Sequence, residues 1–282
     1  MLFWPEVERI VDRALAEDLA LGDPTTQALV PPDLQGQGSL LVKAPGVLAG
    51  MEVAALVFHR VDPGAELEVL VRDGAAVQPG TVTGVVKGRV ASLLQAERTA
   101  LNLLTRLSGI ATETSRYVQA VAGTGCTIVD TRKTAPGLRS LDKYAVRVGG
   151  GRNHRYHLGD GILIKDNHLQ ALKLQGLSLA QGIARLRAGA HHLLKIEVEV
   201  KDLGEARQAV AAGAEAIMLD NMGLEEMARV VRKFKGKVLI EASGGINLSN
   251  VRQVAETGVD LISVGALTHS PRALDISLEL EY

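Results

Sequence analysis

Apolar residues recur with a helical period near the beginning of the chain. Between residues 6 and 19 they form one stripe, made of Val7, Ile10, Val11, Ala14 and Leu15. This i, i+3, i+4, i+7, i+8 spacing is typical of an amphipathic helix, and Pro5 suits the first turn of such a helix. We therefore predict a helix over residues 6–19 that packs against a sheet.

The pattern changes to short strands between residues 38 and 87. Apolar runs and alternating positions predict a helix at 51–61 among strands near residues 39–43, 46–50, 67–71 and 81–87. Proline-glycine and aspartate-glycine pairs divide these elements, as they do in turns. Residues 71–80 also resemble the hairpins of biotinyl and lipoyl carrier domains. Lys87 fits a carrier poorly, because a modified lysine belongs at an exposed hairpin tip.

Two helical stretches follow, at residues 93–107 and 111–121, with a break expected at Ser108 and Gly109. We expect this pair to bridge the first unit and the next one. On spacing alone, Arg98 is a solvated residue of the polar face that pairs with Glu97.

From residue 127 onward, strands and helices alternate. Strands are predicted at 127–131, 161–165, 195–200, 216–220, 238–242 and 261–264, with helices near 138–148, 179–188, 205–212, 224–234 and 249–256. This order gives a parallel sheet with right-handed crossovers, which closes most simply into a barrel. Six strands in about 140 residues are too few for an eightfold barrel, which takes about 250 residues, so we expect a reduced barrel. An open doubly wound sheet is the alternative, although no Gly-x-Gly-x-x-Gly follows the first strand.

Composition narrows the class of protein. The 282 residues are 46% hydrophobic and 22% charged, which is ordinary for a globular protein. Apolar runs stay shorter than the roughly 18 residues of a membrane span, and the N-terminus lacks the pattern of a signal peptide, so we expect a cytoplasmic protein without a membrane partner. The single Cys126 excludes a cysteine metal cluster and is expected to be packed. An aromatic content of 3% argues against a nucleic-acid partner.

Basic residues are concentrated in one stretch. Between Thr131 and Asp166 there are eight Lys or Arg and three Asp, in a chain of formal net charge -1. Such a concentration repels itself unless it is fully solvated or meets anions. Several of these residues directly follow apolar runs or lie beside the glycine triplet 149–151, where loops approach phosphates. The stretch predicts a pocket for a multiply anionic small molecule.

Polar residues also follow the predicted strands, and these ends meet on one face of a parallel barrel. They include Arg132, Lys133, Lys165, Glu199 and Asp220. The charges of residues 195–201 alternate with Ile and Val and should face the barrel interior. Pairing within the protein, as between Lys195 and Glu197, and use in a site both remain open for these charges.

Glycines follow the last two strands, within residues 241–246 and 263–268. Backbone N–H groups there can approach a phosphate closely, although glycine at a strand end is often only a turn. His154 is a candidate acid or base, or one more donor beside Arg155. No Ser/His/Asp or Cys/His set suggests a covalent nucleophile, so catalysis would depend on positioning and electrostatics.

Taken together, the motifs resemble the type II phosphoribosyltransferases, and within them the quinolinate phosphoribosyltransferase family. The resemblance runs in order along the chain from Gly22-Asp23-Pro24-Thr25-Thr26 onward. It rests on residues 97–102 (ERTALN), 130–134 (DTRKT), 149–155 (GGGRNHR), 164–168 (IKDNH), 197–200 (EVEV), 219–221 (LDN), 243–245 (SGG) and 264–268 (VGALT).

The resemblance implies an α/β fold of two domains. An N-terminal α/β sandwich would cover residues 1–108 and be joined by the C-terminal segment 267–282, and an incomplete, seven-stranded α/β barrel would cover residues 109–266. It also implies a homodimer, sometimes assembled into a hexamer, in which the N-terminal domain of one subunit covers the barrel mouth of the other.

The resemblance also implies an activity. The family transfers phosphoribosyl from phosphoribosyl pyrophosphate to quinolinate with decarboxylation, as a step of NAD biosynthesis, and uses Mg²⁺. A paralogue of the same fold that acts on a different base, such as those encoded with molybdate transporters, is the alternative.

Site residues follow from the matched motifs. Arg98 would reach the quinolinate of the partner subunit. Carboxylates of quinolinate would be held by Arg132, His154, Arg155 and Lys165. Lys133 would contact the pyrophosphate, and Glu199 and Asp220 would contact the ribose directly or through Mg²⁺, which makes these three the catalytic candidates. The remaining substrate-binding positions are Thr131 and the 5-phosphate loops Ser243, Gly244, Gly245 and Val264, Gly265, Ala266.

Overall fold

The computed structural model describes residues 2–281, which form two units. The first unit contains the residues up to Ser115, Thr134–Gly150 and the residues from Leu267 on. The second unit contains Arg116–Lys133 and Gly151–Ala266. The carboxyl end of the chain therefore returns to the first unit.

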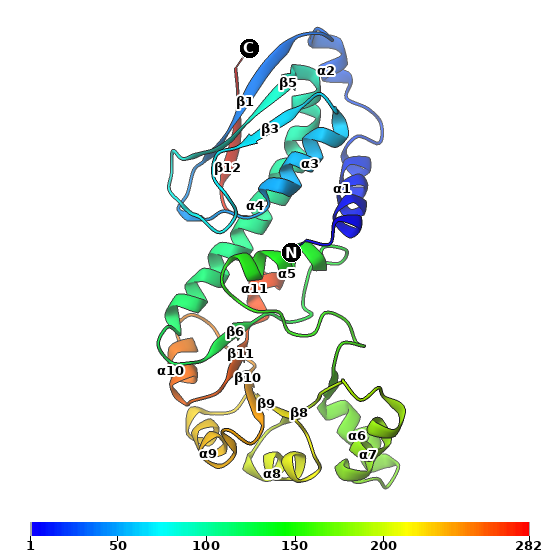
Figure 1. Ribbon diagram of the computed structural model, residues 1–282, viewed down its shortest axis with the longest axis vertical. Coiled ribbons are helices and arrows are strands. Elements are labelled where there is room, and N and C mark those ends of the chain that lie inside the picture. The colour runs from blue at the N-terminus through cyan, green and yellow to red at the C-terminus, as the bar shows by residue number, and fades with distance from the viewer. Residues whose placement is uncertain (1, 282) are drawn as a thin grey trace. The chain divides into compact units, whose positions relative to one another are not determined.

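The first unit is built on a four-stranded antiparallel sheet (Figure 1), in the order β12 (Ile276–Glu281), β1 (Gln35–Val42), β5 (Val82–Arg89) and β3 (Glu66–Val69). A second, small sheet pairs β2 (Gly46–Val47) with β4 (Ala76–Val77). The helices are α1 (Trp4–Asp18), α2 (Pro24–Leu29), α3 (Met51–Val61) and α5 (Arg139–Val148), the beginning of α4 (Val90–Ala120), and α11 (Ala266–His269) at the edge of the unit. The helices predicted at 6–19 and 51–61 are confirmed as α1 and α3.

Helix α4 is continuous over 31 residues, so the predicted break at Ser108 and Gly109 was wrong. The hydroxyl of Ser108 accepts a hydrogen bond from the N–H of Ala49 (3.0 Å) and is within 3.2 Å of the Ala49 carbonyl. Gly109 allows the backbone at Arg272 to approach, because a Cβ at this position would collide with it. Both residues serve close packing within a helix, which a breaker signal in the sequence does not reveal.

Helix α5 clusters with the first unit, whereas the sequence suggests a barrel helix in this place. Two hydrogen bonds of 2.9 Å join the guanidinium of Arg106 to the fully buried carboxylate of Asp142. The hydroxyl of Tyr144 donates to Asp73 at 2.6 Å. A paired buried carboxylate and a half-buried hydroxyl therefore fix α5, and neither is visible in the hydrophobic pattern.

The structure contradicts the hypothesis of a biotinyl or lipoyl carrier domain. Lys87 lies inside β5, where it is paired with Gln37 of β1 on one side and with Glu66 of β3 on the other. A central strand of a sheet does not present a lysine at a hairpin tip.

Asp62 provides a stability prediction for the first unit. Its buried carboxylate accepts hydrogen bonds from Arg89 (2.8 Å), Ser92 (2.9 Å) and the N–H of Gly64 (2.9 Å). The hydrogen bond from Arg89 is the main cause that lowers the pKa of Asp62 to about 2. We expect Asp62→Ala to lower the free energy of unfolding by about 1–3 kcal/mol at pH 7, measured by urea denaturation.

The pH dependence of this contribution has a definite sign. A carboxyl group whose pKa is lower in the folded state stabilises the fold above its unfolded pKa. The gap between wild type and Asp62→Ala should therefore be full above about pH 4 and close as the pH falls toward 2, between the ordinary carboxyl pKa of 3.8 and the folded pKa of about 2. Asp33→Ala, at an exposed position, is the control. A gap that stays constant with pH would contradict the assigned role.

The second unit contains a parallel sheet in the order β6 (Thr127–Val129), β11 (Leu261–Ser263), β10 (Leu239–Ser243), β9 (Ala216–Asp220), β8 (Ile196–Val200) and β7 (Ile162–Ile164). Within residues 2–281 this sheet has six strands, as the hydrophobic pattern predicts, rather than the seven that the resemblance implies. The segment after Gly150 runs as a loop that forms an isolated bridge to β6, between Val129 and Arg152. The strands β6 and β7 are therefore the two edges of the sheet.

Helices connect these strands and cover the sheet (Figure 1). They are α6 (Asp166–Leu174), α7 (Leu179–Gly189), α8 (Leu203–Ala211), α9 (Leu224–Phe234) and α10 (Val251–Glu256). The last four agree with prediction to within a few residues. Helix α6 is absent from the prediction because it is short and its apolar signal is weak: Leu169 and Leu172 are only partly buried, and no residue of the helix is fully buried.

No helix among the described residues is long and apolar enough to span a lipid bilayer. Cys126 is half-buried, and burial is the main cause that raises the pKa of its thiol to about 12. A thiol with so high a pKa is a poor nucleophile at neutral pH, in agreement with the predicted packing role.

Candidate functional site

Polar side chains lie in two tiers at the carboxyl ends of β8, β9 and β10. Side chains two residues apart on a strand share a face of the sheet. Glu199, Asp220 and Ser243 lie at or next to the last residue of their strands and form the outer tier. Glu197 and Glu241 lie two residues earlier on β8 and β10 and form the inner tier. The predicted convergence of strand ends is thus present in the second unit.

An ion pair joins the outer tier to the residue that follows β7. The ammonium of Lys165 lies 3.0 Å from Glu199, whose side chain is 14% exposed. The sequence left open whether Lys195 and Glu197 pair with each other, and this pairing is wrong. Lys195 is exposed at the other end of β8, and Glu197 contacts His154 instead. The charges on β8 therefore belong to the site.

Two arginines crowd one another beside these carboxylates. Burial and then the charge of Arg132 lower the pKa of Arg155. The Nε atom of Arg132 is buried without a hydrogen-bond partner within the described residues. The guanidinium of Arg155 donates to the carbonyl of Gly161 at 2.9 Å. Like charges held together with an unpaired buried donor indicate a position for an anion.

The turn that carries Arg132 is held by Thr131. The Thr131 hydroxyl accepts a hydrogen bond from the N–H of Lys133 at 3.0 Å. This contact closes a short turn directly after β6, so that Arg132 and Lys133 leave the strand in the same turn. Lys133 itself is exposed.

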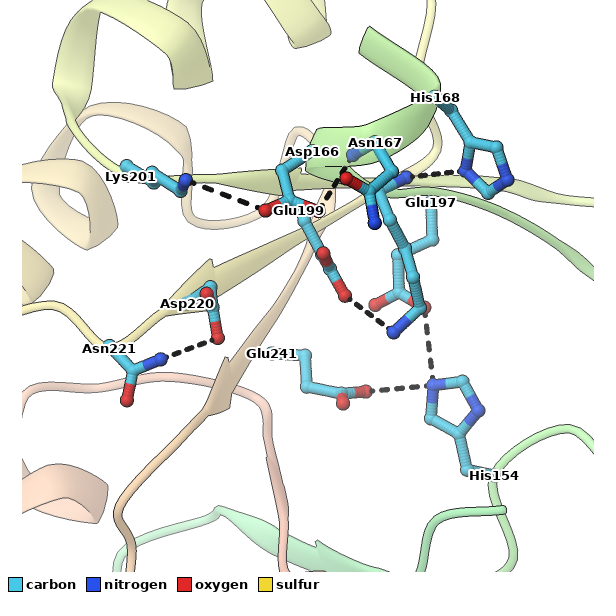
Figure 2. A network of polar contacts seen from close by, with 11 residues as sticks. His154, Asp166, Asn167, His168, Glu197, Glu199, Lys201, Asp220, Asn221 and Glu241 are labelled. Atoms are coloured by element: carbon cyan, nitrogen blue, oxygen red, sulfur yellow. Dashed lines mark hydrogen bonds and ion pairs between the residues drawn. The ribbon is translucent and has the colours of Figure 1, made fainter. Parts of the chain in front are cut away.

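The inner tier surrounds the imidazole of His154 (Figure 2). The Nε2 atom lies 3.2 Å from Glu197 and 3.4 Å from Glu241, and the Nδ1 atom accepts a hydrogen bond from the N–H of Arg155 at 2.8 Å. Burial lowers the pKa of His154, but hydrogen bonds to the two glutamates, and their charges, outweigh it and raise the pKa to about 10. The Arg155 N–H opposes a proton on Nδ1. The raised pKa and the Arg155 contact both place a hydrogen on Nε2. Nε2 is protonated in the imidazolium and also in the neutral tautomer that the Arg155 N–H favours.

The loop that carries His154 is tied to the end of β6 by Asp130. The buried carboxylate of Asp130 accepts hydrogen bonds from the N–H of His154 (2.8 Å) and the side-chain amide of Asn153 (2.6 Å). From the sequence, Asp130 and Asn153 were not assigned a role in holding this loop. Their signal was the position of Asp130 at the end of an apolar run, ahead of the basic residues.

Glycines and one asparagine shape the turns after β9 and β10. Gly244 and Gly245 have φ of +92° and +63°, and Asn221 has φ of +52°. The N–H of Asn221 donates to the carbonyl of Ser243 (2.9 Å), and its amide donates to Asp220 (3.0 Å) (Figure 2). A Cβ at Gly244 would collide with the side chain of Asn221. Consecutive left-handed residues present backbone N–H groups to anions, as a phosphate loop requires.

The second predicted phosphate loop follows β11. The N–H of Val264 donates to the carbonyl of Val129 at 3.0 Å, which ties the end of β11 to β6. Gly265 and Ala266 come directly after this tie and are half-buried. Both predicted loops thus leave neighbouring strands of one sheet.

Two sets of residues have the chemistry of metal ligands. Glu199 and Asp220 are partly exposed carboxylates at the ends of adjacent strands, and such hard oxygen donors fit Mg²⁺. His154, Glu197 and Glu241 place their ligand atoms within 4.8 Å of one another. The second set was not foreseen from the sequence.

One predicted site residue belongs to the other unit. Arg98 lies exposed on α4, within the first unit, and its charge lowers the pKa of Glu97, although burial has the larger effect and leaves that pKa raised. The predicted residues that the structure brings together are those of the second unit, from Arg132 to Ser243.

The chain is similar to characterised proteins over nearly its whole length. Residues 23–108 match the family model of the quinolinate phosphoribosyl transferase N-terminal domain, and residues 110–279 match the C-terminal domain of the same name. A nicotinate-nucleotide pyrophosphorylase [carboxylating] of Mycobacterium leprae is 48% identical, over 96% of this chain and 95% of that protein. A probable nicotinate-nucleotide pyrophosphorylase [carboxylating] of Synechocystis is 44% identical, over 98% of this chain and 93% of that protein.

Solved structures agree with this similarity. The crystal structure of NadC from Streptococcus pyogenes superposes with a TM-score of 0.95 at 40% identity and covers 100% of this chain and 99% of that one. The arrangement of elements described above is therefore found in a related protein.

Proposed function

The chain belongs to the quinolinate phosphoribosyltransferase family, and we propose that it transfers phosphoribosyl from phosphoribosyl pyrophosphate to quinolinate with loss of CO₂. The products are nicotinate mononucleotide, pyrophosphate and CO₂. The observation that carries the proposal is the pair of crowded arginines, one with an unpaired buried donor, beside the Lys165–Glu199 ion pair. Two carboxylates of a pyridine diacid match this set of cations.

Each substrate has a matching part of the site. Arg132, Arg155 and Lys165 would bind the carboxylates of quinolinate. His154, which the resemblance also assigns to these carboxylates, would act on them through its contact with the N–H of Arg155. Lys133 would bind the pyrophosphate, and the turns that contain Gly244 and Gly265 would bind the 5-phosphate through backbone N–H groups.

The chemistry follows from charge development. Departure of pyrophosphate leaves positive charge on the ribose ring, which the carboxylates of Glu199 and Asp220 would stabilise from the strand ends. The pyridine nitrogen, held by the arginines, attacks C1 of the ribose with inversion. When the bond between C2 and the 2-carboxylate breaks, CO₂ leaves and the electron pair stays on C2, where the adjacent pyridinium nitrogen stabilises it. C2 then takes up a proton from water. No acyl or glycosyl intermediate on the protein is needed.

Glu199 and Asp220 would hold Mg²⁺, directly or through the substrate. When bound, the ion neutralises phosphate charge and favours departure of pyrophosphate. We also propose a homodimer with shared active sites, or a hexamer of such dimers, in the cytoplasm. What supports the shared site is that Arg98 is exposed in the first unit while the other candidates gather in the second.

The test is an assay with phosphoribosyl pyrophosphate and Mg²⁺ that compares quinolinate with nicotinate. We expect CO₂ release and nicotinate mononucleotide from quinolinate, and no turnover with nicotinate. Addition of a chelator should abolish the reaction, and excess Mg²⁺ should restore it. Turnover with another base in place of quinolinate would identify a paralogue with different specificity and refute the proposal.

A further inference from the structure

Glu197 and Glu241 present two acidic groups inside the barrel sheet. Glu241 is 1% exposed and Glu197 is 9% exposed. One oxygen of Glu241 has no hydrogen-bond partner within the described residues. Burying two carboxylates this close together costs free energy, because like charges repel and both lose water. We therefore expect them to have a partner and a function.

The geometry around His154 decides between a metal site and a proton-mediated contact. A histidine that binds a metal through Nε2 normally carries hydrogen on Nδ1 and donates it to an acceptor. Here Nδ1 faces a donor, the N–H of Arg155, at 2.8 Å. Nε2 therefore carries the hydrogen and donates it to Glu197 and Glu241. This tautomer cannot bind a metal at Nε2, so the geometry favours a hydrogen-bonded clamp.

The clamp reaches a substrate-binding arginine. Glu197 and Glu241 hold one edge of the His154 ring, and the opposite edge holds the main chain of Arg155. The guanidinium of Arg155 is then fixed at its other end by the carbonyl of Gly161. Misplacing the main chain here would misplace the guanidinium.

We propose that Glu197 and Glu241 are positioning residues for quinolinate, acting through the His154 ring on Arg155. This inference rests on the proposed function of the same site. Neither glutamate touches substrate in this scheme. Replacing either glutamate should therefore raise the KM for quinolinate and leave the KM for phosphoribosyl pyrophosphate unchanged. The outer tier and the glycine turns, which would bind phosphoribosyl pyrophosphate, are made of other residues.

The experiment uses the full-length protein with Glu241→Ala and Glu241→Gln. We expect Glu241→Ala to raise the quinolinate KM on the order of 10- to 100-fold, the range that supporting residues behind a ligand typically show. Glu241→Gln keeps an oxygen acceptor for Nε2–H and should stay within about threefold of wild type, because the neutral amide still accepts the hydrogen bond. The KM for phosphoribosyl pyrophosphate should change less than about twofold in both.

A double-mutant cycle separates positioning from general stability. In a His154→Ala background, Glu241→Ala should add little to the quinolinate KM, because the ring through which it acts is gone. Glu215→Ala is the matched control: this glutamate directly precedes β9 of the same sheet, pairs with Arg187 and accepts a hydrogen bond from the N–H of Ile196 at 2.8 Å, at the end away from the site. It should lower the melting temperature without changing either KM.

Three results would overturn the inference. The first is an equal rise in both KM values, and the second is additive effects in the cycle. The third is a tightly held metal in the purified wild-type protein that is lost on Glu241→Ala, measured by elemental analysis. Failure of the proposed function is a separate result, since wild-type protein would then release no CO₂ from quinolinate at any concentration.

Discussion

Replacement of Lys133 by alanine is expected to lower kcat by roughly 30- to 1000-fold, because it removes about 2–4 kcal/mol of transition-state stabilisation. Lys133 leaves β6 in the turn that Thr131 closes, directly beside Arg132. Its ammonium is the candidate for the negative charge that grows on the departing pyrophosphate. A charge contact that strengthens as the bond breaks affects kcat more than substrate affinity.

Steady-state assays of CO₂ release check this expectation. Lys195→Ala is the matched control, because Lys195 is also an exposed lysine next to a strand of the sheet but precedes β8 instead of following it. It should keep wild-type kcat. If Lys133→Ala instead raised only the KM for phosphoribosyl pyrophosphate, Lys133 would bind ground state and transition state equally, and its catalytic assignment would be wrong.

The second unit could be predicted from the sequence because strand and helix patterns alternate along it. Its strands are largely buried and appear as short apolar runs, and the helices that were predicted each have one apolar stripe, so each of these signals depends on the element's own residues. Parallel order then places all carboxyl ends together, which is why Lys165 and Glu199 could be expected to meet before any distance was known.

The inner tier could not be predicted in the same way. The sequence shows Glu197 as one charge in an alternating strand, and Lys195 stands two residues away as an obvious partner. The actual partner, His154, lies in a loop 43 residues earlier in the chain. Loop conformation depends on specific contacts such as those of Asp130 and has no periodic signal.

Asn221 shows the same limit for backbone conformation. Its left-handed φ of +52° is set by a main-chain hydrogen bond to Ser243, the last residue of the neighbouring strand, and by contact with Gly244, which follows that strand. The dipeptide Asp220-Asn221 alone indicates a turn and does not reveal which strand end the turn will meet. Tertiary contacts decide that, so the link between the Asp220 and Ser243 positions emerges only from the structure.

A complementation experiment tests the expected contribution of Arg98 to the partner's site. Arg98→Ala and Arg132→Ala should each lower quinolinate turnover by about 100-fold or more as homodimers, because each removes a charge-assisted contact to a carboxylate. Co-expression with two different tags, followed by purification on both, yields heterodimers. In these, one site combines the intact barrel of the Arg98→Ala subunit with the intact Arg98 of the other subunit, and the second site has both defects.

The heterodimer should therefore recover about half of wild-type turnover, as expected for one intact site of two in a two-fold symmetric dimer. Recovery requires that Arg98 act across the subunit boundary, since an Arg98 that served its own barrel would leave both sites of the heterodimer defective. Activity no higher than that of the two homodimers would exclude the shared site. Arg98→Lys as a homodimer adds a chemical control, because a lysine keeps the charge but loses bidentate contact and should retain more turnover than Arg98→Ala but less than wild type.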